Sequence, residues 1–288
     1  MGEAVYRDFD AEAMELQYNP RLTVADVDGI IADWASRSAA FTQRIACELD
    51  LAYGTRPAET LDLYKPEAPG GPVLIFIHGG YWRALDKQPY AFATEALVAA
   101  GALVASINYT LCPAVSLDEI VRQSRATCAW VWREAASHGG DANRIHVAGH
   151  SAGGHLAAMM AATRWPEFAG DLPADLLKSA TPISGLLDLE PLLATQVNED
   201  VRMDAATATR NSPMALPPAR DLPMTVAVGG AETDEFHRQS REFRAQWAGQ
   251  LGAIDYIQTE GENHFTIVEG LVDPLSPITR ALLGHMGL

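Results

Sequence analysis

Residues 144–154 read RIHVAGHSAGG, and this stretch decides the fold because a serine stands between two glycines where an expected strand meets an expected helix. Gly149, Ser151 and Gly153 fit the pattern G-x-S-x-G. A serine on a sharp strand-to-helix turn occupies a strained backbone region, so the residues around it must be small enough to avoid a collision. The pattern therefore predicts a turn that lifts the Ser151 hydroxyl above a sheet as a nucleophile.

The helix expected to follow Ser151 adds an electrostatic argument. Its N-terminus carries free N–H groups and the positive end of the helix dipole, both directed at the atom that the serine would attack. We expect the N–H of Ala152 to bind the oxyanion that develops there. In the alternative interpretation, Ser151 only caps the helix, and the two glycines serve a tight turn.

Strands and helices alternate along much of the chain, which predicts an α/β fold with a mostly parallel central sheet and helices on both faces. Apolar runs bounded by turn residues indicate strands buried in such a sheet. The predicted strands are Val73–Ile77, Ala102–Asn108, Arg144–Ala148, Ala180–Ile183, Met224–Gly229 and Ile254–Gln258, and the predicted helices are Tyr90–Ala100, Leu117–Ala136 and Ala152–Thr163. Because the chemically interesting residues occur in both halves, we expect a single domain over residues 1–288.

Two segments depart from the alternation. The N-terminal segment, about residues 1–60, is predicted to be helical, because apolar residues from Ile30 to Ile45 recur at steps of three and four. Residues 186–221 are rich in Pro, Asn, Asp and Thr, which indicates an insertion over the sheet. We expect this insertion to form part of a substrate lid.

The sequence HGGYW, which begins at His78, follows the first predicted strand. A glycine-rich loop at this place supplies the second oxyanion donor in many serine hydrolases. The candidate donors are the N–H groups of Gly79, Gly80 and Tyr81, while Tyr81 and Trp82 are expected to line the substrate pocket. His78 is expected to brace the loop. The alternative is a plain glycine turn followed by two aromatic core residues.

A serine nucleophile needs a base, and the chain order for this arrangement is serine, acid, histidine. His264 follows the last predicted strand and is therefore the candidate base. Its imidazole would take the proton of Ser151 and return it to the leaving group. His150 and His155 flank the nucleophile and are assigned to packing around the site, with His150 also a candidate substrate contact.

Together these motifs resemble the α/β-hydrolase family of kynurenine formamidase (arylformamidase) and related carboxylesterases. HGGYW and GHSAGG carry the resemblance, together with YNPR at residues 18–21, NYTLCP at 108–113 and EFHRQS at 235–240. HGG and GxSxG are shared by many esterases and lipases, whereas the Tyr-Trp pair and EFHRQS are narrower. The resemblance implies an α/β-hydrolase fold and hydrolysis of an aryl formamide or a small ester without a cofactor.

The resemblance also indicates which residue is the acid that orients His264. When the chain is aligned on Gly229 and on Glu235, the usual aspartate of the family falls on Glu232, so this sequence departs from the family. Glutamate can orient an imidazole equally well if the loop retreats to absorb the extra methylene. Asp234 remains the alternative acid. Asp234 and Glu235 could instead be acids that favour the N-terminus of a helix.

The sequence thus predicts a serine hydrolase that cleaves a small ester or an aryl formamide, such as an N-formylkynurenine-like compound, through an acyl-enzyme. One alternative is a general short-acyl carboxylesterase or amidase unrelated to tryptophan breakdown. Another is a non-catalytic binding protein with the hydrolase fold. The phosphate-loop and G-x-G-x-x-G patterns are missing, so no nucleotide cofactor is expected, and no metal site is expected either.

The composition of the chain excludes some classes of binding partner. The formal net charge of −16 opposes binding to nucleic acid or to an anionic membrane, and 48% hydrophobic residues exclude disorder as the overall state. The acidic start of the chain lacks a secretory signal pattern, so we expect a cytoplasmic location. Cys47, Cys112 and Cys128 are expected to be reduced core residues. The expected partner is a small-molecule ester or amide substrate, and a homodimer is left open.

Overall fold

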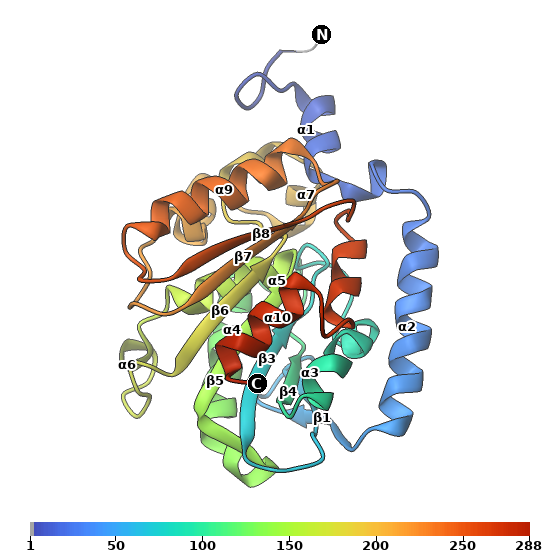
Figure 1. The fold of residues 1–288 in the computed structure, drawn as a ribbon. Helices are drawn as coiled ribbons and strands as arrows, with labels where there is room; N and C mark the ends of the chain where they lie inside the picture. The colour runs from blue at the N-terminus through green and yellow to red at the C-terminus, as the bar shows by residue number, and fades with distance from the viewer. Residues whose placement is uncertain (1–2) are drawn as a thin grey trace.

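A computed structural model describes residues 3–288, so residues 1–2 of the predicted N-terminal segment lie outside the described residues. Within that range, eight strands form one sheet in the order β1-β2-β4-β3-β5-β6-β7-β8 (Figure 1). The strands are β1 Cys47–Ala52, β2 Thr60–Tyr64, β3 Gly71–Ile77, β4 Leu103–Ile107, β5 Gly140–His150, β6 Leu177–Ile183, β7 Met224–Gly229 and β8 Ile254–Thr259. Only the β1–β2 and β2–β4 pairs are antiparallel, which confirms the prediction of a mostly parallel sheet.

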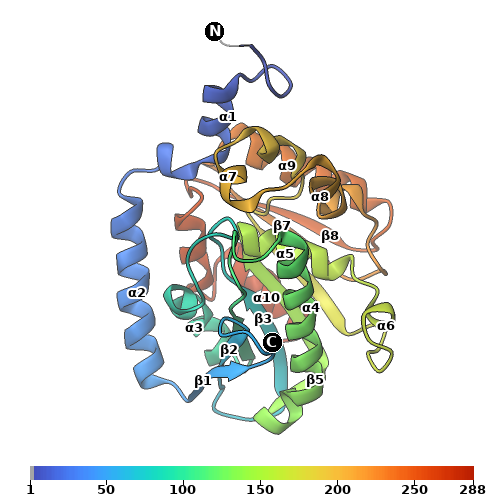
Figure 2. The same ribbon diagram turned by 180° about the vertical axis from the view of Figure 1, so that it is seen from behind.

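Helices cover both faces of this sheet. Helices α2, α3 and α10 lie on the face turned toward the viewer in Figure 1, and α4, α5 and α9 cover the opposite face, seen in Figure 2. The α-helices are α1 Ala11–Tyr18, α2 Val27–Arg44, α3 Glu95–Ala99, α4 Leu117–Glu134, α5 Ala152–Ala161, α6 Trp165–Phe168, α7 Val197–Val201, α8 Ala205–Arg210, α9 Asp234–Ala248 and α10 Pro277–Met286. The 3₁₀ helices are η1 Pro20–Leu22, η2 Gln88–Thr94, η3 Ala135–His138, η4 Glu190–Ala194, η5 Pro213–Ala215 and η6 Thr266–Leu271.

Strand β3 shows why the apolar run at its centre is continuous. Side chains of a strand alternate between the two faces of the sheet. Val73 and Ile75 belong to the core under α4, α5 and α9, whereas Leu74 and Phe76 belong to the core under α2, α3 and α10. All four are fully buried, so every position of the strand needs an apolar residue.

The N-terminal segment differs from the prediction. Helix α2 ends at Arg44, and the strands β1 and β2 follow where a helical segment was expected up to about residue 60. Strand β1 lies at the edge of the sheet, half of its residues are exposed, and its pairing with β2 is irregular, so the apolar run that marks a buried strand is absent. Cys47 lies on this edge strand, where it is only partly buried and packs against the core from its rim, whereas Cys112 and Cys128 are buried as expected.

The helix predicted over Tyr90–Ala100 is also only partly correct. The chain forms the 3₁₀ helix η2 and then the short α3, and Pro89 lies in the first turn of η2. Between β6 and β7, residues 186–221 contain only the short helices η4, α7, α8 and η5. Several of their apolar residues, including Leu192 and Val197, pack into the core. Within the described range, no helix combines the length and the apolar character that crossing a bilayer requires.

Candidate active site

Ser151 lies at the turn between β5 and α5, with a positive φ of 58° and ψ −118°, a region that residues other than glycine rarely adopt. The two flanking glycines make this turn possible. A Cβ on Gly149 would lie 2.3 Å from the Gly153 carbonyl oxygen, and a Cβ on Gly153 would lie 2.0 Å from the Ile77 carbonyl oxygen. The Ser151 side chain makes no capping hydrogen bond to α5, so the structure does not support the interpretation of a simple helix cap.

The structure brings Ser151 and His264 together across 113 residues of sequence. The Ser151 hydroxyl donates to His264 Nε2 over 3.0 Å, and His264 Nδ1 donates to the Glu232 carboxylate over 2.6 Å. Both distances are within hydrogen-bond range. The proton of the neutral imidazole is assigned to Nδ1, because a carboxylate can only accept, and Nε2 is then free to accept from the serine. The arrangement gives the serine a base and gives that base an orienting acid.

Glu232 rather than Asp234 contacts the histidine. Its second carboxylate oxygen accepts from the Gly229 N–H over 2.7 Å and from the Ser184 hydroxyl over 2.5 Å, and its side chain is fully buried. Asp234 is the exposed first residue of α9. Ser184, which follows the end of the neighbouring strand β6, was not found from the sequence, because only the fold brings it to the acid loop.

The loop after β3 approaches the nucleophile closely. A Cβ on Gly79 would lie 3.1 Å from Ser151 Cβ and 2.8 Å from the Tyr90 hydroxyl, so a side chain here would force these neighbours to shift. Gly80, Tyr81 and Trp82 follow with φ angles of 115°, 51° and 57°. The Arg83 and Ala84 N–H groups both donate to the Gly80 carbonyl, which closes this segment into a tight turn beside the nucleophile.

Side chains around this loop hold it in place. His78 Nδ1 donates to the Gly79 carbonyl over 2.6 Å, and its ring stacks on Tyr109 at 4.4 Å, which agrees with the expected bracing role. The Tyr81 hydroxyl donates to the backbone carbonyl of Tyr18, at the end of α1. The N-terminal segment therefore contacts the loop that borders the nucleophile.

Ser151 and His264 open into a cavity of about 130 Å³. Tyr81 and His150 line it, as the sequence predicts, and Val197 brings the insertion to its wall. Trp82 does not line it, because its indole turns into the protein interior and is fully buried. The prediction that Trp82 contacts the substrate is therefore not supported by its position.

His150 connects the walls of this cavity to the base. Its Nε2 donates to the backbone carbonyl of His264 over 2.7 Å, and its Nδ1 accepts from the Tyr90 hydroxyl at 3.1 Å. Burial, together with the neighbouring His264, lowers the pKa of His150 well below the usual histidine value. His150 is therefore neutral and positions the backbone that carries His264.

His155, on the first turns of α5, links Trp82 to the insertion. Its Nδ1 accepts from the Trp82 indole over 3.2 Å, and its Nε2 donates to the Asn211 carbonyl over 2.7 Å. Burial lowers the pKa of His155 to about 4. A proton on Nδ1 would remove the acceptor for Trp82, so the folded protein resists protonation of this ring.

We predict that this histidine makes the protein less stable in acid. In the unfolded chain it takes up a proton near pH 6.5, and in the folded chain only near pH 4, so the unfolded state binds more protons between these values. The free energy of unfolding should fall by up to about 3 kcal/mol as the pH is lowered through this window. Urea denaturation at a series of pH values from 7.5 to 4.5 measures this fall in the free energy of unfolding. His155→Gln keeps a polar group but does not titrate, so the fall should be smaller, and an unchanged pH dependence would contradict the assignment.

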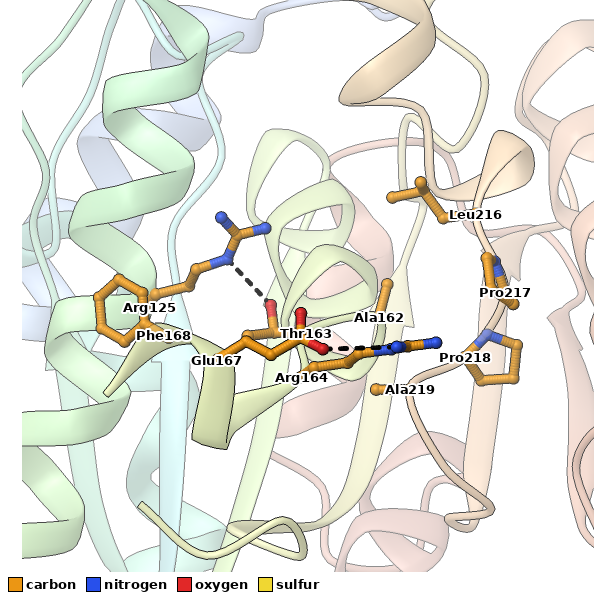
Figure 3. A pocket seen from close by; sticks show the side chains of 10 residues that line it. All are labelled: Arg125, Ala162, Thr163, Arg164, Glu167, Phe168, Leu216, Pro217, Pro218 and Ala219. Carbon is orange, nitrogen blue, oxygen red and sulfur yellow. Dashed lines mark hydrogen bonds and ion pairs between the residues drawn. The ribbon is translucent and has the colours of Figure 1, made fainter. Parts of the chain in front are cut away.

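A second cavity lies at the C-terminal end of α5, away from Ser151 at its N-terminal end. It measures about 430 Å³, and Figure 3 shows the Arg125 Nε donating to the Thr163 hydroxyl in it, over 3.0 Å. It shares no lining residue with the cavity at Ser151, so the larger cavity is not the one with the reactive groups. Among residues 3–288, no three His, Cys, Asp or Glu side chains are grouped so that they could hold a metal ion.

Comparison with known proteins identifies the family of the chain. The family described as BD-FAE matches residues 61–247, a range that contains the loop after β3, the turn at Ser151 and Glu232. The chain belongs to the BD-FAE family. Kynurenine formamidase from Danio rerio is 32% identical to this BD-FAE protein over 98% of both chains. Esterase LipC from Mycobacterium tuberculosis is 36% identical over 46% of this chain and 34% of its own length.

A solved structure supports the same assignment. The crystal structure of a putative thioesterase from Silicibacter sp. TM1040 superposes on this BD-FAE protein with a TM-score of 0.83. The match covers 92% of this chain and 97% of that one, and the two sequences are 32% identical. The α/β-hydrolase fold and the resemblance to kynurenine formamidases and esterases are thus confirmed. The chain is a hydrolase of this type.

Proposed function

We propose that the protein is a serine hydrolase that cleaves small esters or aryl formamides through an acyl-enzyme, with Ser151 as nucleophile, His264 as base and Glu232 as the orienting acid. One observation carries the proposal. The Ser151 hydroxyl, held above the sheet by a strained turn, lies 3.0 Å from an imidazole whose other nitrogen lies 2.6 Å from a buried carboxylate.

The reaction follows from these contacts. Ser151 Oγ bonds to the acyl carbon as its proton passes to His264 Nε2, and Glu232 stabilises the resulting imidazolium. The N–H group of Ala152 and those of the Gly80–Tyr81 turn bind the oxyanion. The carbon–nitrogen or carbon–oxygen bond then breaks, and the leaving group takes the proton from His264. Water, deprotonated by the same imidazole, releases the acid and restores Ser151.

Two features support short acyl groups. The cavity of about 130 Å³ at Ser151 is small for a ligand site, which suits a formyl or acetyl group on the acyl side. The similarity to a kynurenine formamidase over nearly the whole chain favours an aryl formamide. The same groups would also cleave short esters, and the similarity to an esterase keeps a general carboxylesterase as the second candidate. Rates on N-formylkynurenine and 4-nitrophenyl acetate compare the two.

Labelling with a fluorophosphonate probe tests the nucleophile directly. We expect stoichiometric modification, with the mass shift on the peptide that contains Ser151, since the Ser151 oxygen displaces fluoride from phosphorus. Ser151→Ala should remain unlabelled, and His264→Gln should label far more slowly because the base is lost. A folded wild-type protein that does not react would instead favour a binding protein without catalysis.

A further inference from the structure

Helix α9 begins directly after the loop that carries Glu232, and it lacks a cap of its own. Thr233 has the extended backbone of an N-cap residue, but its side chain accepts no hydrogen bond from the first turn of the helix. A threonine at this place normally satisfies one of the free N–H groups there. The Thr233 hydroxyl instead donates to the backbone carbonyl of Gln17, near the end of α1, over 2.6 Å. Helix α1 lies beside one end of α9 in both views (Figure 1, Figure 2).

Gln17 supplies the missing cap from a distant part of the chain. Its side-chain oxygen, Oε1, accepts from the Glu235 N–H over 3.1 Å. Glu235 is the second residue of α9, and its N–H is one that the side chain of an N-cap residue would serve. In return, Thr233 provides a donor for the Gln17 carbonyl, one of the last four of α1, which have no acceptor role within their own helix. The two helix ends therefore satisfy each other across 216 residues of sequence.

Tyr18, the last residue of α1, fixes this junction in the protein interior. It is buried, and its hydroxyl donates to the Glu235 carboxylate over 2.6 Å. The centroid of its ring lies 6.2 Å from that of Phe236, and the Phe236 ring in turn lies 4.6 Å from the His264 imidazole. The end of α1 is thus connected to the proposed base as well as to the loop that carries the proposed acid.

The position of Glu232 depends on this junction, because Glu232 directly precedes Thr233. Before Glu232, the backbone of the loop is anchored by the Ala231 N–H, which donates to a carbonyl of the loop after β8 over 2.8 Å. After Glu232, it is anchored by the hydrogen bond from Thr233 to Gln17. The carboxylate stays 2.6 Å from His264 Nδ1 only while the backbone that carries it is fixed, and small displacements of a catalytic group are costly to the rate.

We propose that Gln17 is a positioning residue of the reaction: by capping α9, it keeps Glu232 within hydrogen-bond distance of His264. This inference rests on the proposed function and adds to it a residue that touches neither the substrate nor the reacting atoms. Gln17 does not line the cavity at Ser151. Its loss should therefore slow the chemical step and leave the binding of substrate unchanged.

Two substitutions at Gln17 separate its hydrogen-bond acceptor from its bulk. Gln17→Met keeps the length of the side chain and removes the acceptor for the Glu235 N–H. We expect kcat for 4-nitrophenyl acetate to fall about tenfold with KM unchanged, because a misplaced catalytic group lowers the rate and not the affinity. Gln17→Glu keeps an oxygen at the same position, so its kcat should stay close to that of the wild type. Thr233→Val keeps the shape of the side chain and loses the donor, so it should resemble Gln17→Met.

A double-mutant cycle shows whether Gln17 acts through Glu232. In a Glu232→Gln background the acid no longer orients His264, so Gln17→Met should lower kcat no further. A role in general stability would instead lower kcat by the same factor in both backgrounds. Ser116→Ala is the matched control, because Ser116 caps α4 by accepting the Glu119 N–H. This variant should lower the urea midpoint of unfolding as Gln17→Met does, and leave kcat unchanged.

Three results would each overturn the proposal: wild-type kcat in a folded Gln17→Met, equal factors in the two backgrounds of the cycle, or a Gln17→Glu variant as slow as Gln17→Met. If Gln17→Met does not fold, the same cycle with Thr233→Val decides by the same criteria. None of these results affects the serine mechanism, which fails only if Ser151→Ala still hydrolyses the substrate.

Discussion

Ser151→Ala is expected to reduce kcat/KM for a short-acyl substrate by roughly a millionfold, as is typical when the nucleophile of a triad is removed. The loss should be this large because the alanine methyl group can neither attack the acyl carbon nor transfer a proton to His264. The fold should survive, because the side chain makes no capping hydrogen bond and its loss leaves the backbone turn unchanged. Steady-state kinetics and urea denaturation of the purified variant measure the two effects.

Ser116, a serine that does cap a helix, provides the matched control. Ser116 precedes α4 and accepts from the Glu119 N–H over 3.3 Å, which is the contact that Ser151 lacks. Ser116→Ala should therefore cost about 1 kcal/mol of stability and leave activity unchanged. Ser151→Ala should instead abolish activity and leave the stability nearly unchanged. If Ser151→Ala lost stability and kept its activity, Ser151 would be a cap and not a nucleophile.

Backbone strain at Ser151 can be measured separately. A non-glycine residue at φ 58° and ψ −118° costs about 1–3 kcal/mol, and glycine adopts this region without that cost. Ser151→Gly should therefore be more stable than Ser151→Ala by about 1 kcal/mol and equally inactive. Equal stability of the two variants would show that the turn carries no strain.

The sequence predicts the centre of the sheet better than its edge. Strand β3 is buried on both faces, so its apolar run is visible in the sequence, whereas β1 is partly exposed and carries Glu48 and Asp50. Residues with such mixed burial give no clear period. The predictions therefore miss β1 and β2, the antiparallel strands added to the parallel core.

The site shows the same division between local and distant information. Ser151 and its glycines form a local motif, and His264 follows from chain order. Ser184 contacts Glu232 only because β6 and β7 are neighbours in the sheet. The two residues are 48 positions apart, and no sequence motif links them. Trp82 is next to Tyr81 in sequence and their rings meet edge-on, but Tyr81 lines the cavity whereas Trp82 is buried in the core. Adjacency in the motif therefore does not predict a shared role.

Glu232→Gln is expected to lower kcat by about 10⁴-fold, the effect of forcing a triad histidine into the wrong tautomer. Gly229 N–H and the Ser184 hydroxyl both donate to one oxygen of Glu232. A glutamine keeps its carbonyl oxygen at that position and so turns its NH₂ group toward His264 Nδ1. The imidazole must then carry its proton on Nε2, where it no longer accepts the proton of Ser151.

Two further variants separate the side-chain length from the identity of the acid. Glu232→Asp retains the charge but is one methylene too short to reach both Gly229 and His264, so we expect an intermediate loss of about tenfold to a hundredfold in kcat. Asp234→Asn should retain nearly full activity, because Asp234 is exposed at the start of α9 and contributes only to the helix dipole. An inactive Asp234→Asn together with an active Glu232→Gln would transfer the role of acid to Asp234, and would require the loop after β7 to rearrange when substrate binds.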